Sequence, residues 1–184
     1  MQRKVFMAAL VTAIACICGC GSHKDPMPEL SSEYYCGTYY GGCGYGTFYD
    51  CFSGEVIVCT NKDLLVYMPK DDSREYILAE TLKLTDVQYD GIVSSINREE
   101  LYYLDPKEQI EICDGDSSYI KLYDENNELL KNCGGYMPAN QSFLNMQKSL
   151  YNYLPMAELN KIRNDWANKL MEVLSFCSAP SSLT

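Results

Sequence analysis

The spacing of apolar positions along the chain predicts both strands and helices. Glu55–Thr60 and Leu64–Met68 are short runs rich in valine, isoleucine and leucine, separated by turn residues at 61–63. Runs of this length and composition, bounded by turn residues, are typical of paired strands. Thr47–Phe52 and Tyr76–Leu84 are further strand candidates, and the second of them leads towards a helix.

The most regular strand pattern lies between Glu108 and Asn132. Apolar and polar residues alternate there in three segments, which are separated by turn residues at 114–116 and 124–127. This pattern predicts a three-strand meander. The glycine-rich stretch Gly134–Pro138 is then expected to leave the sheet.

Three segments have helical spacing. The first follows Thr85, a favourable N-cap residue, and the second begins near Asn140 or Ser142 and ends at Pro155. The third, residues 157–176, carries the longest apolar stripe, which is expected to pack on a core. The stripe consists of Leu159, Ile162, Trp166, Leu170, Val173 and Cys177.

Together these segments predict one α+β domain over residues 34–177. We expect an antiparallel, disulfide-stapled sheet packed by two or three helices, with a long C-terminal helix. Residues 178–184 are expected to form a flexible tail.

The N-terminus has the layout of a secretory signal peptide. Arg3 and Lys4 precede an uncharged apolar segment over residues 5–15. This segment is shorter than the roughly 20 residues that a transmembrane helix needs. It leads into Ile17-Cys18-Gly19-Cys20, which resembles a bacterial lipobox, with an aliphatic residue, a small residue and then cysteine at the required positions.

The lipobox resemblance implies that residues 1–19 are removed as a signal peptide and that Cys20 is lipidated. The family carries a thioether-linked diacylglycerol and a further acyl chain such as palmitate, and two or more chains anchor a protein stably. Gly21 after the cysteine implies an outer-membrane address in a bacterium with two membranes. Residues 20–33, with Pro26 and Pro28, are then expected to form a lipid-anchored tether.

Two other cleavage sites stay open. Ala13-Ile14-Ala15 before Cys16 is a second lipobox candidate, and the two alanines alone also fit a plain signal-peptidase site. Cleavage as a plain signal-peptidase site would give a secreted or periplasmic protein. Cys20 is favoured because the polar stretch Gly21–Pro26 follows it directly.

The chain is acidic, with a formal net charge of −10. Loss of Arg3 and Lys4 with the signal peptide makes the remainder more negative still. An acidic protein repels nucleic acid and anionic lipid surfaces, so no nucleic-acid partner is expected. The charge is expected to keep an exported domain soluble.

Seven cysteines follow Cys20, a density typical of an oxidising compartment. We expect disulfides whose connectivity the sequence does not fix, although Cys113 and Cys133 end the outer strands of the predicted meander. No Cys-x2-Cys pair is present, so a zinc cage is not expected. The disulfide candidates are Cys36, Cys43, Cys51, Cys59, Cys113, Cys133 and Cys177.

Residues 34–52 mix aromatic residues, glycines and cysteines. Structurally, this mixture predicts irregular loop and short strand pinned by disulfides. Functionally, it predicts a rigid tyrosine-rich surface that suits a sugar or a protein partner. The candidate surface residues are Tyr34, Tyr35, Tyr39, Tyr40, Tyr45 and Tyr49.

Patterns for catalysis or metal binding are weak. His23, the one histidine, lies in the tether, where nothing holds it as a catalytic base. Asp114–Glu125 resembles a calcium loop, but the sixth position lacks the required glycine. Glu99 or Glu100 could pair with Asp105 as a glycosidase-type dyad, which keeps an exported hydrolase as an alternative. No metal or cofactor is expected.

The segment Tyr119–Pro155 is similar to uncharacterised bacterial lipoprotein domains in its two strands, its Gly-Gly-Tyr exit and its amphipathic helix. This resemblance implies an α+β fold and a compartment, and no activity. The sequence therefore favours a lipid-anchored cell-envelope protein. We expect a non-enzymatic binding or scaffolding module that meets the membrane through its anchor and binds an envelope protein or glycan.

Overall fold

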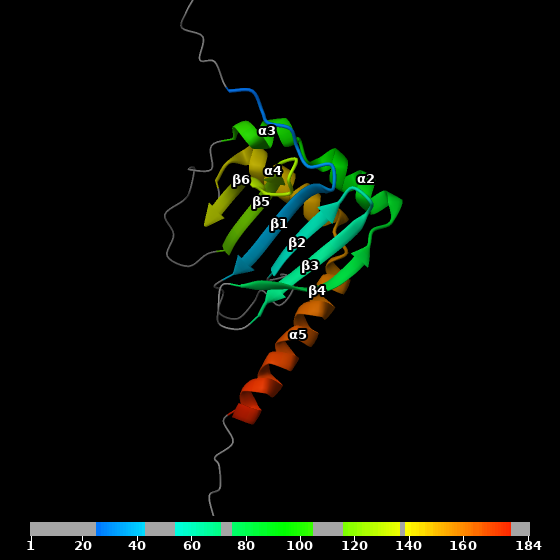
Figure 1. Ribbon diagram of the computed structural model, residues 1–184, viewed down its shortest axis with the longest axis vertical. Helices are drawn as coiled ribbons and strands as arrows, with labels where there is room; N and C mark the ends of the chain where they lie inside the picture. Colours follow the sequence, from blue (N-terminus) through cyan, green and yellow to red (C-terminus); the bar gives the residue numbers. More distant parts are fainter. Residues whose placement is uncertain (1–24, 43–53, 71–74, 105–115, 137–138, 178–184) are drawn as a thin grey trace, which may run out of the picture.

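The computed structural model describes residues 25–42, 54–70, 75–104, 116–136 and 139–177. Six antiparallel strands form one sheet in the order β4-β3-β2-β1-β5-β6 (Figure 1). The prediction of an α+β fold with an antiparallel sheet is confirmed. The strands are β1 (Tyr34–Gly42), β2 (Gly54–Cys59), β3 (Asp63–Pro69), β4 (Tyr76–Lys83), β5 (Asp116–Tyr123) and β6 (Leu129–Tyr136).

Four helices are described, one more than the largest number predicted. The added helix is α3, a short helix whose N-cap is Asn97. The side chains of Thr85 and Asn140 cap α2 and α4, so both predicted helix starts are confirmed. The helices are α2 (Asp86–Ser95), α3 (Arg98–Tyr103), α4 (Gln141–Tyr153) and α5 (Met156–Cys177).

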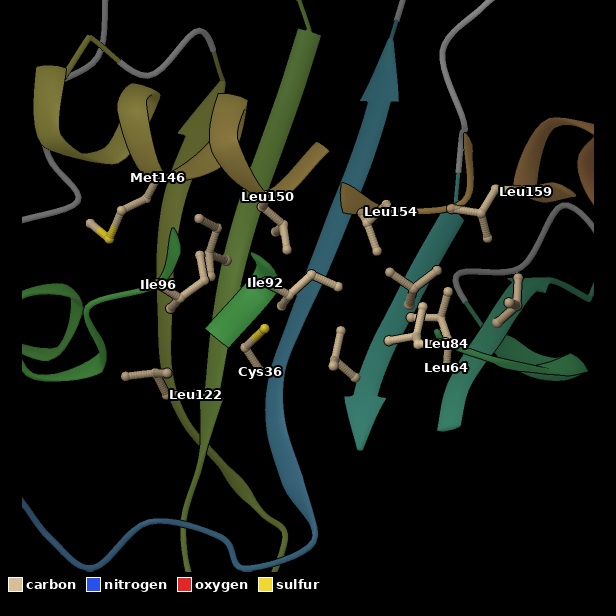
Figure 2. Packing of buried hydrophobic residues seen from close by; sticks show 14 of the residues in the cluster. Cys36, Leu64, Leu84, Ile92, Ile96, Leu122, Met146, Leu150, Leu154 and Leu159 are labelled. Atoms are coloured by element: carbon tan, nitrogen blue, oxygen red, sulfur yellow. The ribbon is translucent and has the colours of Figure 1, made fainter. Parts of the chain in front are cut away.

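The buried residues of these helices belong to one hydrophobic cluster together with one face of the sheet. Figure 2 shows Ile92, Leu150 and Leu159 converging on the strands from α2, α4 and α5. The Trp166 indole donates to the Pro69 carbonyl at 2.8 Å and ties α5 to the end of β3. The described helices therefore cover one face of the sheet.

The central strand β1 was predicted as irregular loop and short strand, which is wrong for Tyr34–Gly42. This stretch is a strand that pairs with β2 on one side and β5 on the other, with a β-bulge between Tyr34 and Cys36. Pairing on both edges outweighs the low strand propensity of its glycines. Thr38 is buried, and its hydroxyl donates to the Tyr119 carbonyl at 2.9 Å.

The predicted meander is present in part. Its last two strands are β5 and β6, joined through the turn residues 124–127, while its first segment lies outside the described residues. Gly134–Tyr136 were expected to leave the sheet, but they pair with Ser117–Tyr119 as the end of β6. Gly134 has φ 120°, and a Cβ there would lie 2.2 Å from the Ser118 carbonyl oxygen, so the close strand approach needs glycine.

Residues before Tyr34 also contact the domain. Leu30 forms a β-bridge with Asp124, and the buried Ser31 donates its backbone N–H to the Tyr123 carbonyl at 3.0 Å. The predicted tether at residues 20–33 therefore overlaps with residues that the fold holds.

Cys36 and Cys59 were predicted as disulfide candidates, but both are free thiols. Cys36 lies in the core under the helices, whereas Cys59 faces the other side of the sheet, so the two cannot bond to each other. Cys133 is buried in the core, but its predicted partner Cys113 lies outside the described residues, so that pairing stays a prediction. Cys43 and Cys51 also lie outside them, and the Cys177 side chain is not described.

Within the described part of the chain, no helix has both the length and the hydrophobicity that crossing a membrane requires.

Candidate functional site

The sheet face away from the helices carries tyrosines and one ion pair. In β3, Leu64, Val66 and Met68 point into the core, so the alternate residue Tyr67 points to the opposite face. Residues of β1, β2 and β5 share this face with it. We call the set the tyrosine face, and it consists of Tyr34, Glu55, Tyr67, Lys121 and Tyr123.

The aromatic rings of this face contact one another. Tyr34 meets Tyr123 edge to face, with ring centroids 5.3 Å apart and planes at 78°. Burial raises the pKa of Tyr67, and the nearby Tyr34, Cys59 and Glu55 raise it further. Tyr34 and Tyr67 are half-buried, so part of each ring is open to a partner.

An ion pair crosses the centre of the face. Lys121 Nζ lies 2.7 Å from Glu55 Oε1, and the two side chains are only 18% and 17% exposed. Glu55 is on β2 and Lys121 on β5, so the pair spans β1 between them. Gly37 of β1 lies opposite Lys121 in the register and has no side chain to obstruct the crossing. The result is a fixed polar group among aromatic rings.

Tyr123 adds a second polar group. Its side chain is 7% exposed, and its hydroxyl has no hydrogen-bond partner among the described residues. Burial and the nearby Glu55 raise its pKa, so the hydroxyl keeps its proton. A Cβ on Gly37 would lie 2.5 Å from this oxygen, which shows that the ring lies directly over β1. Buried hydroxyls are seldom left unpaired, so this one is an unsatisfied polar atom beneath the face.

Tyr35 points the other way. A β-bulge between Tyr34 and Cys36 places its ring under α2, where the hydroxyl donates to the carbonyls of Val93 at 2.9 Å and Ile96 at 3.2 Å. The Arg98 guanidinium stacks over the ring at 4.9 Å. Burial raises the pKa of Tyr35 to about 12. Tyr35 therefore closes the end of α2 and does not share a surface with Tyr34.

Sequence reasoning located Tyr34 and no other member of the tyrosine face. Of the remaining candidates, Tyr39 and Tyr40 lie in β1, but their side chains are not described. Cys20, Tyr45 and Tyr49 lie outside the described residues.

Tyr67, Tyr123, Glu55 and Lys121 were missed because they are far apart in the sequence. The available signal was the alternation itself. Tyr67 separates two buried positions of β3, and Lys121 separates Ile120 from Leu122. Such interleaved residues mark the second face of a sheet.

Two open hollows of about 440 Å³ each lie elsewhere, and Tyr103 lines both of them. The first includes Glu99 and Glu100 from the proposed carboxylate dyad, whose third candidate, Asp105, lies outside the described residues. Elsewhere on the surface, hydrogen bonds from Lys83 and Lys62 lower the pKa of Asp63 and of Asp86. Among the described residues, no group of three or more His, Cys, Asp and Glu side chains is placed to hold a metal ion.

Comparison with protein-family models found no match, and a search of curated proteins likewise found none.

Proposed function

We propose that this chain is a lipid-anchored protein of the cell envelope, attached to the outer membrane. Its tyrosine face binds another envelope component, which is a protein or a cell-wall glycan. Acylation at Cys20 supplies the membrane attachment. The folded domain supplies recognition without catalysis.

The observation that carries the binding role is the composition of the tyrosine face. Tyr34 and Tyr67 offer half-buried rings with few rotatable bonds, which bind at low cost in conformational entropy. The Glu55–Lys121 pair supplies polar groups between them. Aromatic rings around a few fixed polar groups are typical of sites that bind sugars or protein surfaces.

The address rests on the lipobox resemblance at Ile17–Cys20 and on the cysteine content. Disulfides, among them a bond between Cys113 and Cys133, and a long C-terminal helix remain part of this proposal. An exported hydrolase and a secreted binding protein cleaved at Ala15 are the alternatives that the sequence leaves open.

The binding role is tested with the full-length protein in detergent micelles. Two probes are used: purified cell-wall sacculi and solubilised envelope proteins from the source bacterium. A double variant, Tyr34→Ser with Tyr67→Ser, removes both half-exposed rings and is expected to weaken binding to one probe by about tenfold or more, because aromatic residues dominate such interfaces.

Tyr153→Ser is the matched control, because Tyr153 is a 37%-exposed tyrosine on α4, on the helix-covered side of the sheet. It should bind like the unchanged protein. Equal binding by the double variant, or no binding to either probe, contradicts the proposed recognition role.

A further inference from the structure

The N-terminal segment enters the fold next to α3. The Tyr103 hydroxyl donates to the Asp25 carbonyl at 3.0 Å, and Leu30 then bridges Asp124 beyond the end of β5. Ser31 fixes the entry into β1, since its hydroxyl accepts from the backbone N–H of Tyr34 at 2.8 Å. Figure 1 shows this blue segment passing α3 at the end of the molecule opposite to the far end of α5.

Chain length limits how far this end can lie from the lipid. Five peptide units separate Cys20 from Asp25, and an extended chain spans at most about 18 Å over that number. The helix α5, with 22 residues, is itself about 33 Å long. The linker between the lipid and the domain is therefore shorter than the domain, so it keeps the end near Asp25 close to the membrane and leaves the far end of α5 free to lie farther away.

The surface at this end has a composition suited to the membrane interface. One of the two hollows is lined by Asp25, Tyr102, Tyr103, Leu130 and Lys131, and the adjoining Leu129 is 54% exposed. Tyrosine places an apolar ring and a polar tip at the headgroup level, and lysine extends its charge outward from an apolar stem. We call Tyr102, Tyr103, Leu129, Leu130 and Lys131 the anchor-proximal surface.

We propose that the anchor-proximal surface rests against lipid headgroups when Cys20 is acylated, with α5 directed away from the membrane. The inference rests on the proposed lipid anchor and adds an orientation to it. The acyl chains supply the affinity, while the short anchor and this surface fix which side faces the lipid.

The test uses the full-length lipidated protein in vesicles of phosphatidylcholine and phosphatidylethanolamine. A water-soluble amine reagent labels lysines, and peptide mass spectrometry measures the labelling rate at each site. The comparison variant carries about twenty glycine and serine residues inserted between Gly21 and Ser22, which lengthens the anchor by roughly 25 Å without altering the domain. Vesicle flotation shows in both cases whether the protein is anchored.

With the short anchor, we expect Lys131 to label about threefold more slowly than with the long one, because the lipid surface shields it. Lys161 and Lys169, which are exposed on α5, should label at the same rate in both proteins. Equal labelling of Lys131 in two proteins that both float overturns the orientation and leaves the anchor intact. A protein that does not float overturns the anchor, and the orientation with it.

Discussion

Cys36 shows how strongly the core acts on a single residue. Its side chain is fully buried, and Figure 2 shows its sulfur pointing into the core beside Ile92. Burial raises the pKa of this thiol to about 12, against an opposing effect of the Arg98 guanidinium. A thiol in such surroundings stays protonated and is a poor nucleophile.

The raised pKa predicts that stability falls at alkaline pH. In the unfolded chain the Cys36 thiol titrates at its ordinary pKa near 9.0, whereas in the folded protein it keeps its proton up to about pH 12. Stability from this group is therefore complete below about pH 9 and declines as the pH rises towards 12. Between roughly pH 8 and pH 10 the loss amounts to about 1 kcal/mol.

Urea unfolding of the unchanged protein and of Cys36→Ser at several pH values checks this prediction. Serine does not titrate in this range, so the variant should show the smaller decline. The two profiles also contain the same contributions from the other groups with raised pKa, such as Tyr35 and Tyr123. Parallel profiles would mean that the Cys36 thiol is accessible to water in the folded state.

The packing of α2 on α4 depends on a glycine inside a helix. A Cβ on Gly91 would lie 2.2 Å from the Tyr153 ring, closer than any carbon contact allows. Alanine is favoured over glycine in a helix interior by about 1 kcal/mol, so the glycine is explained by this contact and not by helix propensity.

Gly91→Ala is accordingly expected to destabilise the protein by about 1–3 kcal/mol, since the Tyr153 ring must move. In a Tyr153→Ala background the same change should instead stabilise by up to about 1 kcal/mol, because only the helix propensity remains. Urea unfolding of the four proteins in this double-mutant cycle measures both signs. Destabilisation of equal size in both backgrounds would rule out the α2–α4 contact as the reason for Gly91.

Elements with strong local signals were predictable, and those that depend on distant partners were not. The apolar run Leu64–Met68 of β3 and the caps of α2 and α4 are local, and they were identified from the sequence. β1 is rich in glycine and becomes a strand through β2 and β5, which lie far along the chain. The short α3 carries too few residues to show a helical period.

At the scale of the whole molecule, the two faces of the sheet have different environments. One face and the helices build the core, and the tyrosine face on the other side is the proposed binding surface. The sequence located Tyr34, but it grouped Tyr35 with it because neighbouring residues in the chain were assumed to share a surface. The bulge after Tyr34 and the pairing of β1 with β5 determine which face each tyrosine side chain occupies. Neither feature can be read from the sequence alone.

The proposed anchor would link this architecture to a membrane. The domain holds residues from Asp25 onward, so a lipid on Cys20 would keep the α3 end close to the membrane.

Intact-mass analysis of the protein extracted from membranes of the cells that produce it tests the proposed attachment most directly. We predict a chain that begins at Cys20 and carries the added mass of at least two acyl chains. An unmodified chain that begins at Cys16 would contradict it.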